Sequence, residues 1–337
     1  MKGILASVVI ALITTTGSAR ADATDWIRNT LESTRATADS CTSEAAALDG
    51  TLSRIRDIRL PESGKVIVVN IASGVVTAYE DGVPVIESKA VVGKAATPTP
   101  ELNTHVTFVR PNPTWTVPES IIKRNKWLDK LASQPEFFED NNFKVISGGV
   151  EVSPYDAAEN PEAVESFVQK PGPGNALGSM KIGIENNQAI YLHDTNDPGK
   201  FDSEVRAASA GCVRIERVGE IAAWIMDVSP DEMQAMVDDG STQSLTPPEP
   251  VKAILGYWTA WPDATGATRF YPDIYGRDRS CGRTTDPAET ADRHEQLDHE
   301  QPNEERATPG PRFIPAGQNA DGPYSQPAPV WTETEAR

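Results

Sequence analysis

Short segments rich in β-branched residues, separated by turn signals, fill the region between residues 65 and 111 and restrict the possible folds strongly. KVIVVNI begins at Lys65, and VVTAY follows it; after the turn signal at residues 80–82 comes VPVIESKAVV. The rigid Pro-containing loop at residues 97–100 precedes a further strand pattern, HVTFVRP. Several short strands joined by turns predict a sandwich or barrel-like sheet.

Helical patterns flank this strand-rich region. Apolar residues between Asp25 and Arg59 recur at roughly helical spacing, which predicts two helices separated near Asp49-Gly50, within an N-terminal helical segment of residues 22–60. We expect these helices to pack on the domain that follows.

Residues 119–170 form a second, mostly helical block. We interpret SIIKRNKWLDKLASQ, PEFFEDNN and PEAVESFVQ as helical, with starts at Ser120 and Pro135, and FKVIS as a short strand. The Gly- and Pro-rich loop PGPGNALG follows at residues 171–178. By its residues alone, this insertion is either an ordinary packing unit or a projection above a site.

After residue 216 the chain is expected to form two helices and a hairpin. EIAAWIMD is amphipathic, and SPDEMQAMVDD begins with Ser229 as an N-cap and Pro230 at the first helical position. VKAILGYWTAWPD and ATRFYPDIY predict a hairpin that turns at residues 263–266. The fold class is therefore α+β, mainly β.

Both ends of the chain have compositions that differ from the rest. Residues 1–21 combine Lys2, an apolar run and the small-x-small signal Ala19-Arg20-Ala21, which predicts a cleavable secretory signal peptide. Residues 282–337 are rich in Pro and acidic residues, and we expect them to be disordered. The net charge of −18 makes nucleic acid and anionic lipid poor partners, and no other segment has the length of a membrane span.

One stretch, residues 189–216, carries the strongest signal for chemistry. A short apolar strand ends at His193, and a polar loop leads through Gly211 to Cys212 and another strand-like run. An imidazole can take the proton of a thiol nucleophile, and backbone N–H groups at a tight Gly turn can stabilise an oxyanion. If the second run is extended, Arg214 shares a face with Cys212 and can favour the thiolate or hold a substrate carboxylate. Taken alone, an inert buried cysteine is the commoner reading of such a residue.

Other familiar chemistries lack their sequence signals. The chain has no CxxC or HExxH motif and no carboxylate cluster with ligand spacing, so no metal is predicted. The loop at 171–178 lacks the Lys-Ser/Thr of a P-loop, dinucleotide fingerprints are absent, and no cofactor is expected.

The order of the His and Cys motifs resembles that of the L,D-transpeptidases with a YkuD-type catalytic domain. Their signature is a His, a spacer of about fifteen residues, and Ser/Thr-x-Gly-Cys followed by an apolar residue and Arg or Asn; it is filled here by His193, Ser209, Gly211, Cys212, Val213 and Arg214. NPTWTVP at 112–118, PGPGNALG at 171–178, IYLHDT at 190–195 and the segment 257–278 are similar to the larger, lid-bearing branch of Gram-negative envelopes. The resemblance covers about residues 52–279, with Ala210 where many members have a second His.

The resemblance implies a catalytic domain over residues 61–281, with residues 119–170 as a lid, and a specific reaction. Cys212 is expected to attack the third residue of a peptidoglycan stem peptide and expel D-Ala, with His193 as base and the N–H groups of Gly211 and Cys212 as oxyanion donors. A diaminopimelate amine of a second stem then forms a 3-3 cross-link. Further support is expected from Ser209, Gly211 and Asp194, and substrate contacts from Arg214, Tyr191, Trp115 and Asn175. For Trp115 by itself, a place in a core is the favoured alternative.

Several alternatives stay open. With the same acyl-enzyme, the acceptor can be the N-terminus of an outer-membrane protein, or water, which gives carboxypeptidase activity. A wall-binding protein without activity is the alternative of another class. The resemblance also implies a periplasmic location and acylation by carbapenems. Among the three cysteines, Cys41 and Cys281 are a possible disulfide pair if Cys212 is free.

Overall fold

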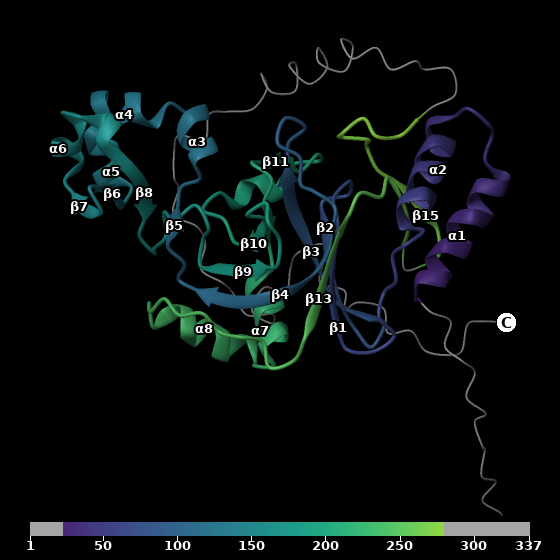
Figure 1. Cartoon of the computed structure of the whole chain (residues 1–337). Coiled ribbons are helices and arrows are strands. Elements are labelled where there is room, and N and C mark those ends of the chain that lie inside the picture. Colours follow the sequence, from purple (N-terminus) through teal and green to yellow (C-terminus); the bar gives the residue numbers. More distant parts are fainter. Residues whose placement is uncertain (1–22, 264, 280–337) are drawn as a thin grey trace, which may run out of the picture.

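A mixed nine-stranded sheet forms the centre of the molecule, and its ends meet to close a barrel (Figure 1). The computed structural model describes residues 23–263 and 265–279, so the predicted signal peptide and C-terminal tail lie outside it. The strand order is β11-β3-β12-β10-β9-β4-β13-β1-β2, and β2 also pairs with β3. The strands are β1 Lys65–Asn70, β2 Val75–Glu80, β3 Val83–Gly93, β4 Leu102–Pro111, β9 Met180–Ile184, β10 Tyr191–His193, β11 Ala207–Ser209, β12 Val213–Ile215 and β13 Val251–Gly256.

The length of β3 explains the closure. The first part of this strand pairs with β2, from Val83 to Lys89, and its last part turns to β12, where Val91 lies opposite Arg214. The barrel-like sheet predicted from the short β-branched segments is therefore confirmed.

Strand β1 is apolar on both faces because each face meets a different core. Ile67 and Val69 point into the barrel, whereas Val66 and Val68 pack against the N-terminal helices α1 (Ala23–Thr37) and α2 (Ser43–Ile55). A strand covered on both sides reads as a continuous apolar run. The predicted packing of the N-terminal helices on the following domain is thus confirmed.

The predicted break between those helices is wrong in position. Helix α1 ends at Thr37, and α2 begins after its N-cap Thr42, whose hydroxyl accepts a hydrogen bond from the Ala45 N–H at 3.1 Å. Gly50 lies inside α2, where a Cβ atom would be 2.4 Å from Asp278 Oδ1. This glycine therefore makes room for a tertiary contact and does not end the helix. Cys41, just before the cap, is disulfide-bonded, and Cys281 lies outside the described residues.

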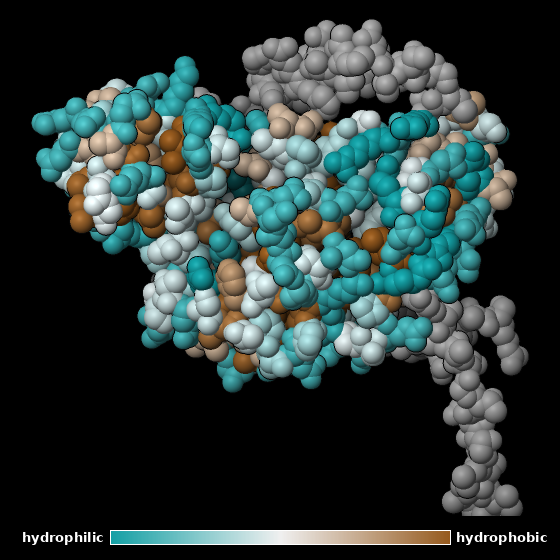
Figure 2. All heavy atoms as spheres, viewed as in Figure 1, coloured by the Kyte–Doolittle hydropathy of each residue, from teal (hydrophilic) through white to brown (hydrophobic). Residues whose placement is uncertain are grey.

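Residues 115–169 form a separate lobe that projects from the barrel beside β4 (Figure 1). Its sheet has the order β5-β8-β6-β7, and its core is built from aromatic side chains such as Trp127, Phe138 and Phe167. Figure 2 shows apolar side chains on its surface, and Val150 is 60% exposed. The elements are β5 Trp115–Thr116, α3 Glu119–Arg124, α4 Trp127–Ser133, α5 Pro135–Asp140, β6 Phe143–Ser147, β7 Val150–Val152, α6 Pro154–Ala158, η1 Pro161–Ala163 and β8 Val164–Gln169.

Within this lobe, the segment PEAVESFVQ does not form the expected α-helix. Its first residues form η1, and the remainder is strand β8, which pairs with β6 along its whole length. Pairing with a distant strand has overridden a local pattern that fits either structure. The helix expected from Ser120 begins one residue earlier at Glu119, and the start at Pro135 is confirmed.

Two helices cover another side of the barrel, and a hairpin follows them. α7 (Val218–Met226) buries Ile221 and Ile225, and α8 (Pro230–Asp238) begins with the predicted Ser229 cap as a full capping box. The hairpin consists of β14 (Ala260–Pro262) and β15 (Thr268–Phe270), whereas β13 pairs with β1 and β4 instead. Among the described helices, none is both long and apolar enough to cross a membrane.

Candidate active site

Strand register places the two predicted catalytic residues on one face of the sheet. β10 and β12 are parallel neighbours, with Leu192 opposite Val213 and His193 opposite Arg214. Leu192 and Val213 are fully buried in the barrel core. Because side chains alternate along a strand, the residues on either side of them face the other way. That face carries Tyr191, His193, Cys212 and Arg214.

The turn that presents Cys212 is held by its own hydrogen bonds. Ser209 Oγ accepts the Gly211 N–H at 3.1 Å and donates to the Cys212 carbonyl at 2.5 Å. Thr99 Oγ1 donates to the Gly211 carbonyl at 2.8 Å, and Gly211 has a φ of 119°, which favours glycine. The Gly211 N–H is thus engaged within the turn, which leaves the Cys212 N–H as the expected oxyanion donor.

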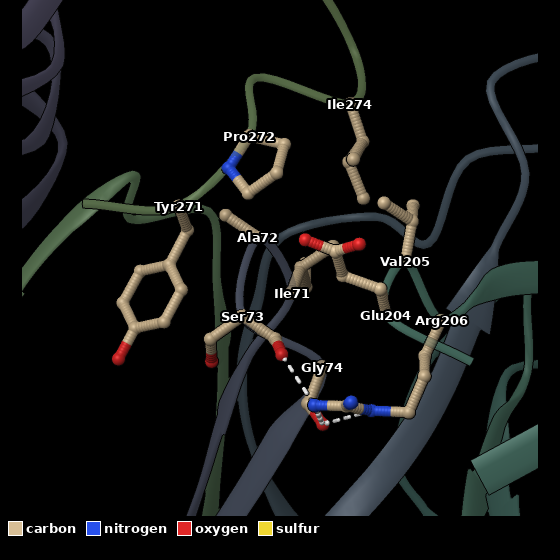
Figure 3. A pocket seen from close by; sticks show the side chains of 10 residues that line it. All are labelled: Ile71, Ala72, Ser73, Gly74, Glu204, Val205, Arg206, Tyr271, Pro272 and Ile274. Carbon is tan, nitrogen blue, oxygen red and sulfur yellow. Dashed lines mark hydrogen bonds between the residues drawn. The ribbon is translucent and has the colours of Figure 1, made fainter. Parts of the chain in front are cut away.

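Arg206 anchors the strand that enters this turn. Its guanidinium donates to the carbonyls of Ser73 at 2.9 Å and Gly74 at 3.2 Å (Figure 3). The next residue, Ala207, pairs with Val92. The small pocket around it is bounded by Ile71, Ala72, Ser73, Gly74, Glu204, Val205, Arg206, Tyr271, Pro272 and Ile274. It includes none of the predicted site residues.

His193 is buried with a neutral imidazole. Burial lowers the pKa of His193 to about 3, helped by the positive charges of Arg214 and Lys181 and opposed by the backbone of Asp194. The side chain is 5% exposed, and within the described part of the chain its Nδ1 atom has no hydrogen-bond partner. A buried unpaired nitrogen is rare, and this one is free to accept a proton.

The Cys212 thiol is half-buried and protonated in this state. Burial raises the pKa of Cys212, while hydrogen bonds from Tyr191 and the charges of Lys181 and Arg214 oppose that rise. The thiol donates to the Ala189 carbonyl over 3.7 Å, and Ala189 has a left-handed φ of 56°. No hydrogen bond joins the thiol to His193 in this arrangement, so proton transfer requires the thiol to turn from Ala189 toward the imidazole.

Tyr191 connects the Cys212 thiol with the lobe. Its ring lies 5.4 Å from the His193 ring, and its hydroxyl interacts with both the Cys212 thiol and the Trp115 side chain. Trp115 belongs to β5, and its indole packs edge-on against Trp127 with ring centroids 6.2 Å apart. Trp115 therefore packs against the lobe core and also touches a residue of the candidate site.

Asp194 and Asn175 support the loops around the imidazole. Asp194 Oδ2 accepts the Ser179 N–H and hydroxyl, both at 2.8 Å. Asn175 is 1% exposed; its amide donates to the carbonyls of Pro113 at 3.1 Å and Lys170 at 2.9 Å and accepts the Leu177 N–H. The polar atoms of Asn175 thus hold the loop 171–178, and its contact with substrate stays a prediction.

Sequence reasoning missed two basic residues on the same face, Lys181 and Arg110. Lys181 lies opposite His193 in the β9–β10 pair, and Arg110 lies opposite Lys181 in the β4–β9 pair. Recognising MKIGIE and IYLH as one antiparallel hairpin would have revealed the first of them. In the part of the chain that the structure describes, no three His, Cys, Asp or Glu side chains gather in a way that could hold a metal ion.

Comparison with known proteins identifies the family of this chain. A model of the L,D-transpeptidase catalytic domain (YkuD) matches residues 64–247, more than half of the chain. A curated Haemophilus influenzae protein named as a candidate L,D-transpeptidase is 30% identical over 228 residues, which are 65% of this chain and 46% of that protein. The chain thus spans less than half of that relative.

Solved structures of low sequence identity also match. An L,D-transpeptidase of Mycobacterium tuberculosis is 15% identical over 56% of this chain and 57% of its own, with a TM-score of 0.26. The C442S mutant of the Enterococcus faecium L,D-transpeptidase is 13% identical over 56% of this chain and 49% of its own, with a TM-score of 0.27. On the evidence of the matched catalytic domain, this α+β chain belongs to the L,D-transpeptidase (YkuD) family.

Proposed function

We propose that this protein is a peptidoglycan L,D-transpeptidase in which Cys212 is the nucleophile and His193 the general base. The observation that carries the proposal is the buried Nδ1 of His193, which has no hydrogen-bond partner among the described residues and lies on the same sheet face as the half-buried Cys212 thiol. A neutral imidazole with an open nitrogen is in the correct state to accept the thiol proton. Membership of the family supports peptide cross-links of the cell wall as the product.

The reaction then follows from these groups. The His193 imidazole takes the thiol proton, and the Cys212 thiolate attacks the carbonyl of diaminopimelate in a tetrapeptide stem. The oxyanion receives hydrogen bonds from the Cys212 N–H and the Tyr191 hydroxyl. Collapse breaks the bond to D-Ala, whose amine takes the proton from His193. The side-chain amine of a second stem attacks the thioester, forms the 3-3 cross-link and restores the thiol.

We assign supporting roles to the groups around this pair. Ser209 holds the nucleophile turn through its two hydrogen bonds, and Asp194 places the imidazole through its backbone. Arg214, level with His193, favours the thiolate by its charge. The lobe of residues 115–169 acts as the lid, because Trp115 joins its core to Tyr191 beside the thiol. The peptidoglycan substrate implies export to the periplasm, and the thiol nucleophile implies acylation by carbapenems.

Intact-mass spectrometry tests this function directly. The wild-type protein and Cys212→Ala are incubated with disaccharide-tetrapeptide and, separately, with a carbapenem. We expect a tripeptide adduct and a carbapenem adduct on the wild type alone, together with a cross-linked dimer that has lost one D-Ala. His193→Ala should abolish tripeptide transfer, whereas His105→Ala is the matched control, because His105 is exposed in β4 beside Glu185.

The same experiment separates the alternatives. An adduct without dimer points to a protein N-terminus or water as the acceptor. Absence of every adduct on a folded wild-type protein would refute catalysis and leave a wall-binding protein.

A further inference from the structure

Four basic side chains form one level row across the candidate active-site face. Arg110 of β4 lies opposite Lys181 of β9, Lys181 opposite His193 of β10, and His193 opposite Arg214 of β12. Their neighbours Val109, Ile182, Leu192 and Val213 are fully buried on the core side. The alternation of side chains therefore brings all four to the outer face, at one level of four adjacent strands.

Two members of this row have no acidic partner. Across residues 23–263 and 265–279, no carboxylate lies within ion-pair distance of Lys181 or Arg110, although the whole chain carries a net charge of −18. Lys181 is half-buried, and its Nζ lies 3.7 Å from the centre of the Tyr191 ring. Arg110 donates to Ser244 Oγ at 2.9 Å and lies over the Phe108 ring.

Keeping these charges together costs stability. Burial lowers the pKa of Lys181, and the charge of Arg110 lowers it further. An unpaired cation of this kind, beside another cation and next to a nucleophile, is typical of a binding site for an anion. The aromatic ring below Lys181 partly compensates the charge without neutralising it.

We propose that Lys181 and Arg110 bind a carboxylate of the donor stem peptide and thereby place its scissile carbonyl at Cys212. This inference rests on the proposed function. Neighbouring strands lie about 4.8 Å apart, so the backbone of Lys181 is two strands, or roughly 10 Å, to the side of Cys212. The long side chain of Lys181 covers part of this distance, because its amine lies over the ring of Tyr191, whose hydroxyl touches the thiol.

Two carboxylates of a tetrapeptide donor fit this position. One is the C-terminal carboxylate of D-Ala, which lies one residue beyond the scissile bond. The other is the free carboxylate at the far end of the diaminopimelate side chain. Both are anions that a Lys and an Arg recognise through charge-assisted hydrogen bonds.

The test compares three donors: the natural tetrapeptide, its C-terminal amide, and a tetrapeptide with lysine in place of diaminopimelate. The rate of acyl-enzyme formation is measured by quenched intact-mass spectrometry for the wild type, Lys181→Met and Arg110→Met. Lys252→Met is the matched control, because Lys252 is a lysine of the same sheet whose amine donates to the Arg59 carbonyl. Circular dichroism and thermal unfolding establish that each variant is folded.

With the natural donor we expect Lys181→Met to acylate about 10–100 times more slowly than the wild type. A loss of this size corresponds to the removal of one charge-assisted hydrogen bond. The wild type should show the same loss with whichever donor lacks the bound carboxylate, and Lys181→Met should lose little more with that donor. Lys181→Arg should recover most of the rate. Any effect of the Lys181 charge on the thiol is common to all three donors and cancels in their ratios.

Equal losses on all three donors, or no loss on any, would overturn the inference while leaving the proposed function standing. If no donor acylates the wild type, the proposed function itself fails, and the carboxylate site fails with it.

Discussion

Replacing Ser209 by alanine should both destabilise the protein and slow its acylation. The Ser209 hydroxyl is buried, with 3% of the residue exposed, and it serves the Gly211 N–H and the Cys212 carbonyl at once. Alanine leaves both of these backbone groups without their hydrogen-bond partner. Each buried polar group left without a hydrogen bond costs about 1–3 kcal/mol, so the two groups together should cost about 2–6 kcal/mol in the free energy of unfolding. The loosened turn should also slow acylation at Cys212 at least about tenfold.

Denaturant unfolding measures the first effect, as a lower midpoint with an unchanged slope. Ser209→Thr keeps the hydroxyl and should retain most of the stability and acylation rate, and Ser203→Ala is the control for an exposed serine. A loss below about 0.5 kcal/mol for Ser209→Ala would mean that water replaces both hydrogen bonds, and it would refute the assignment of Ser209 as the support of the turn.

Three further predictions concern groups around the same site. Asn175→Ala should lower the free energy of unfolding by at least about 3 kcal/mol, because the buried Leu177 N–H and two carbonyls lose their partner; a loss under about 1 kcal/mol in denaturant unfolding would contradict this. Because the folded pKa of His193, about 3, lies below its unfolded value near 6.5, the folded state binds fewer protons between these values, and stability should rise with pH across this range. Unfolding measured from pH 4 to 7 should show a shallower rise for His193→Gln, and equal slopes would show that His193 is not the group responsible. Lys181→Met removes a charge that favours the thiolate, so the pH profile of iodoacetamide alkylation of Cys212 should move to higher pH. An unchanged profile would show that the Lys181 charge does not act on the Cys212 thiol.

Local patterns identified most of the elements correctly. The β-branched runs at residues 65–111 became barrel strands, and Ser229 caps α8 with Glu232 in a capping box. The errors occurred where a distant partner decided the structure. The local sequence at Gly50 predicts a helix break, because the close approach of Asp278, which requires a glycine there, is not visible in neighbouring residues. The local pattern of the β8 segment predicts a helix, because the strand that supplies its hydrogen bonds, β6, lies elsewhere in the chain.

The candidate site divides in the same way. The spacing from His193 to Ser209, Gly211 and Cys212 predicted a nucleophile and its base, since these residues share one short stretch of the chain. Arg110 and Lys181 belong to no comparable local motif. They reach the site only because β4 and β9 pair beside β10 in a fixed register.

The sequence by itself identified the two candidate reacting groups, the family pattern and the strands that carry them, because each depends on residues close together in the chain. Only the tertiary structure decided which side chains surround the thiol, that the Gly211 N–H is engaged by Ser209, and that His193 Nδ1 lacks a partner among the described residues. These properties depend on strand register, burial and the local electric field, which arise when segments distant in the chain close the barrel.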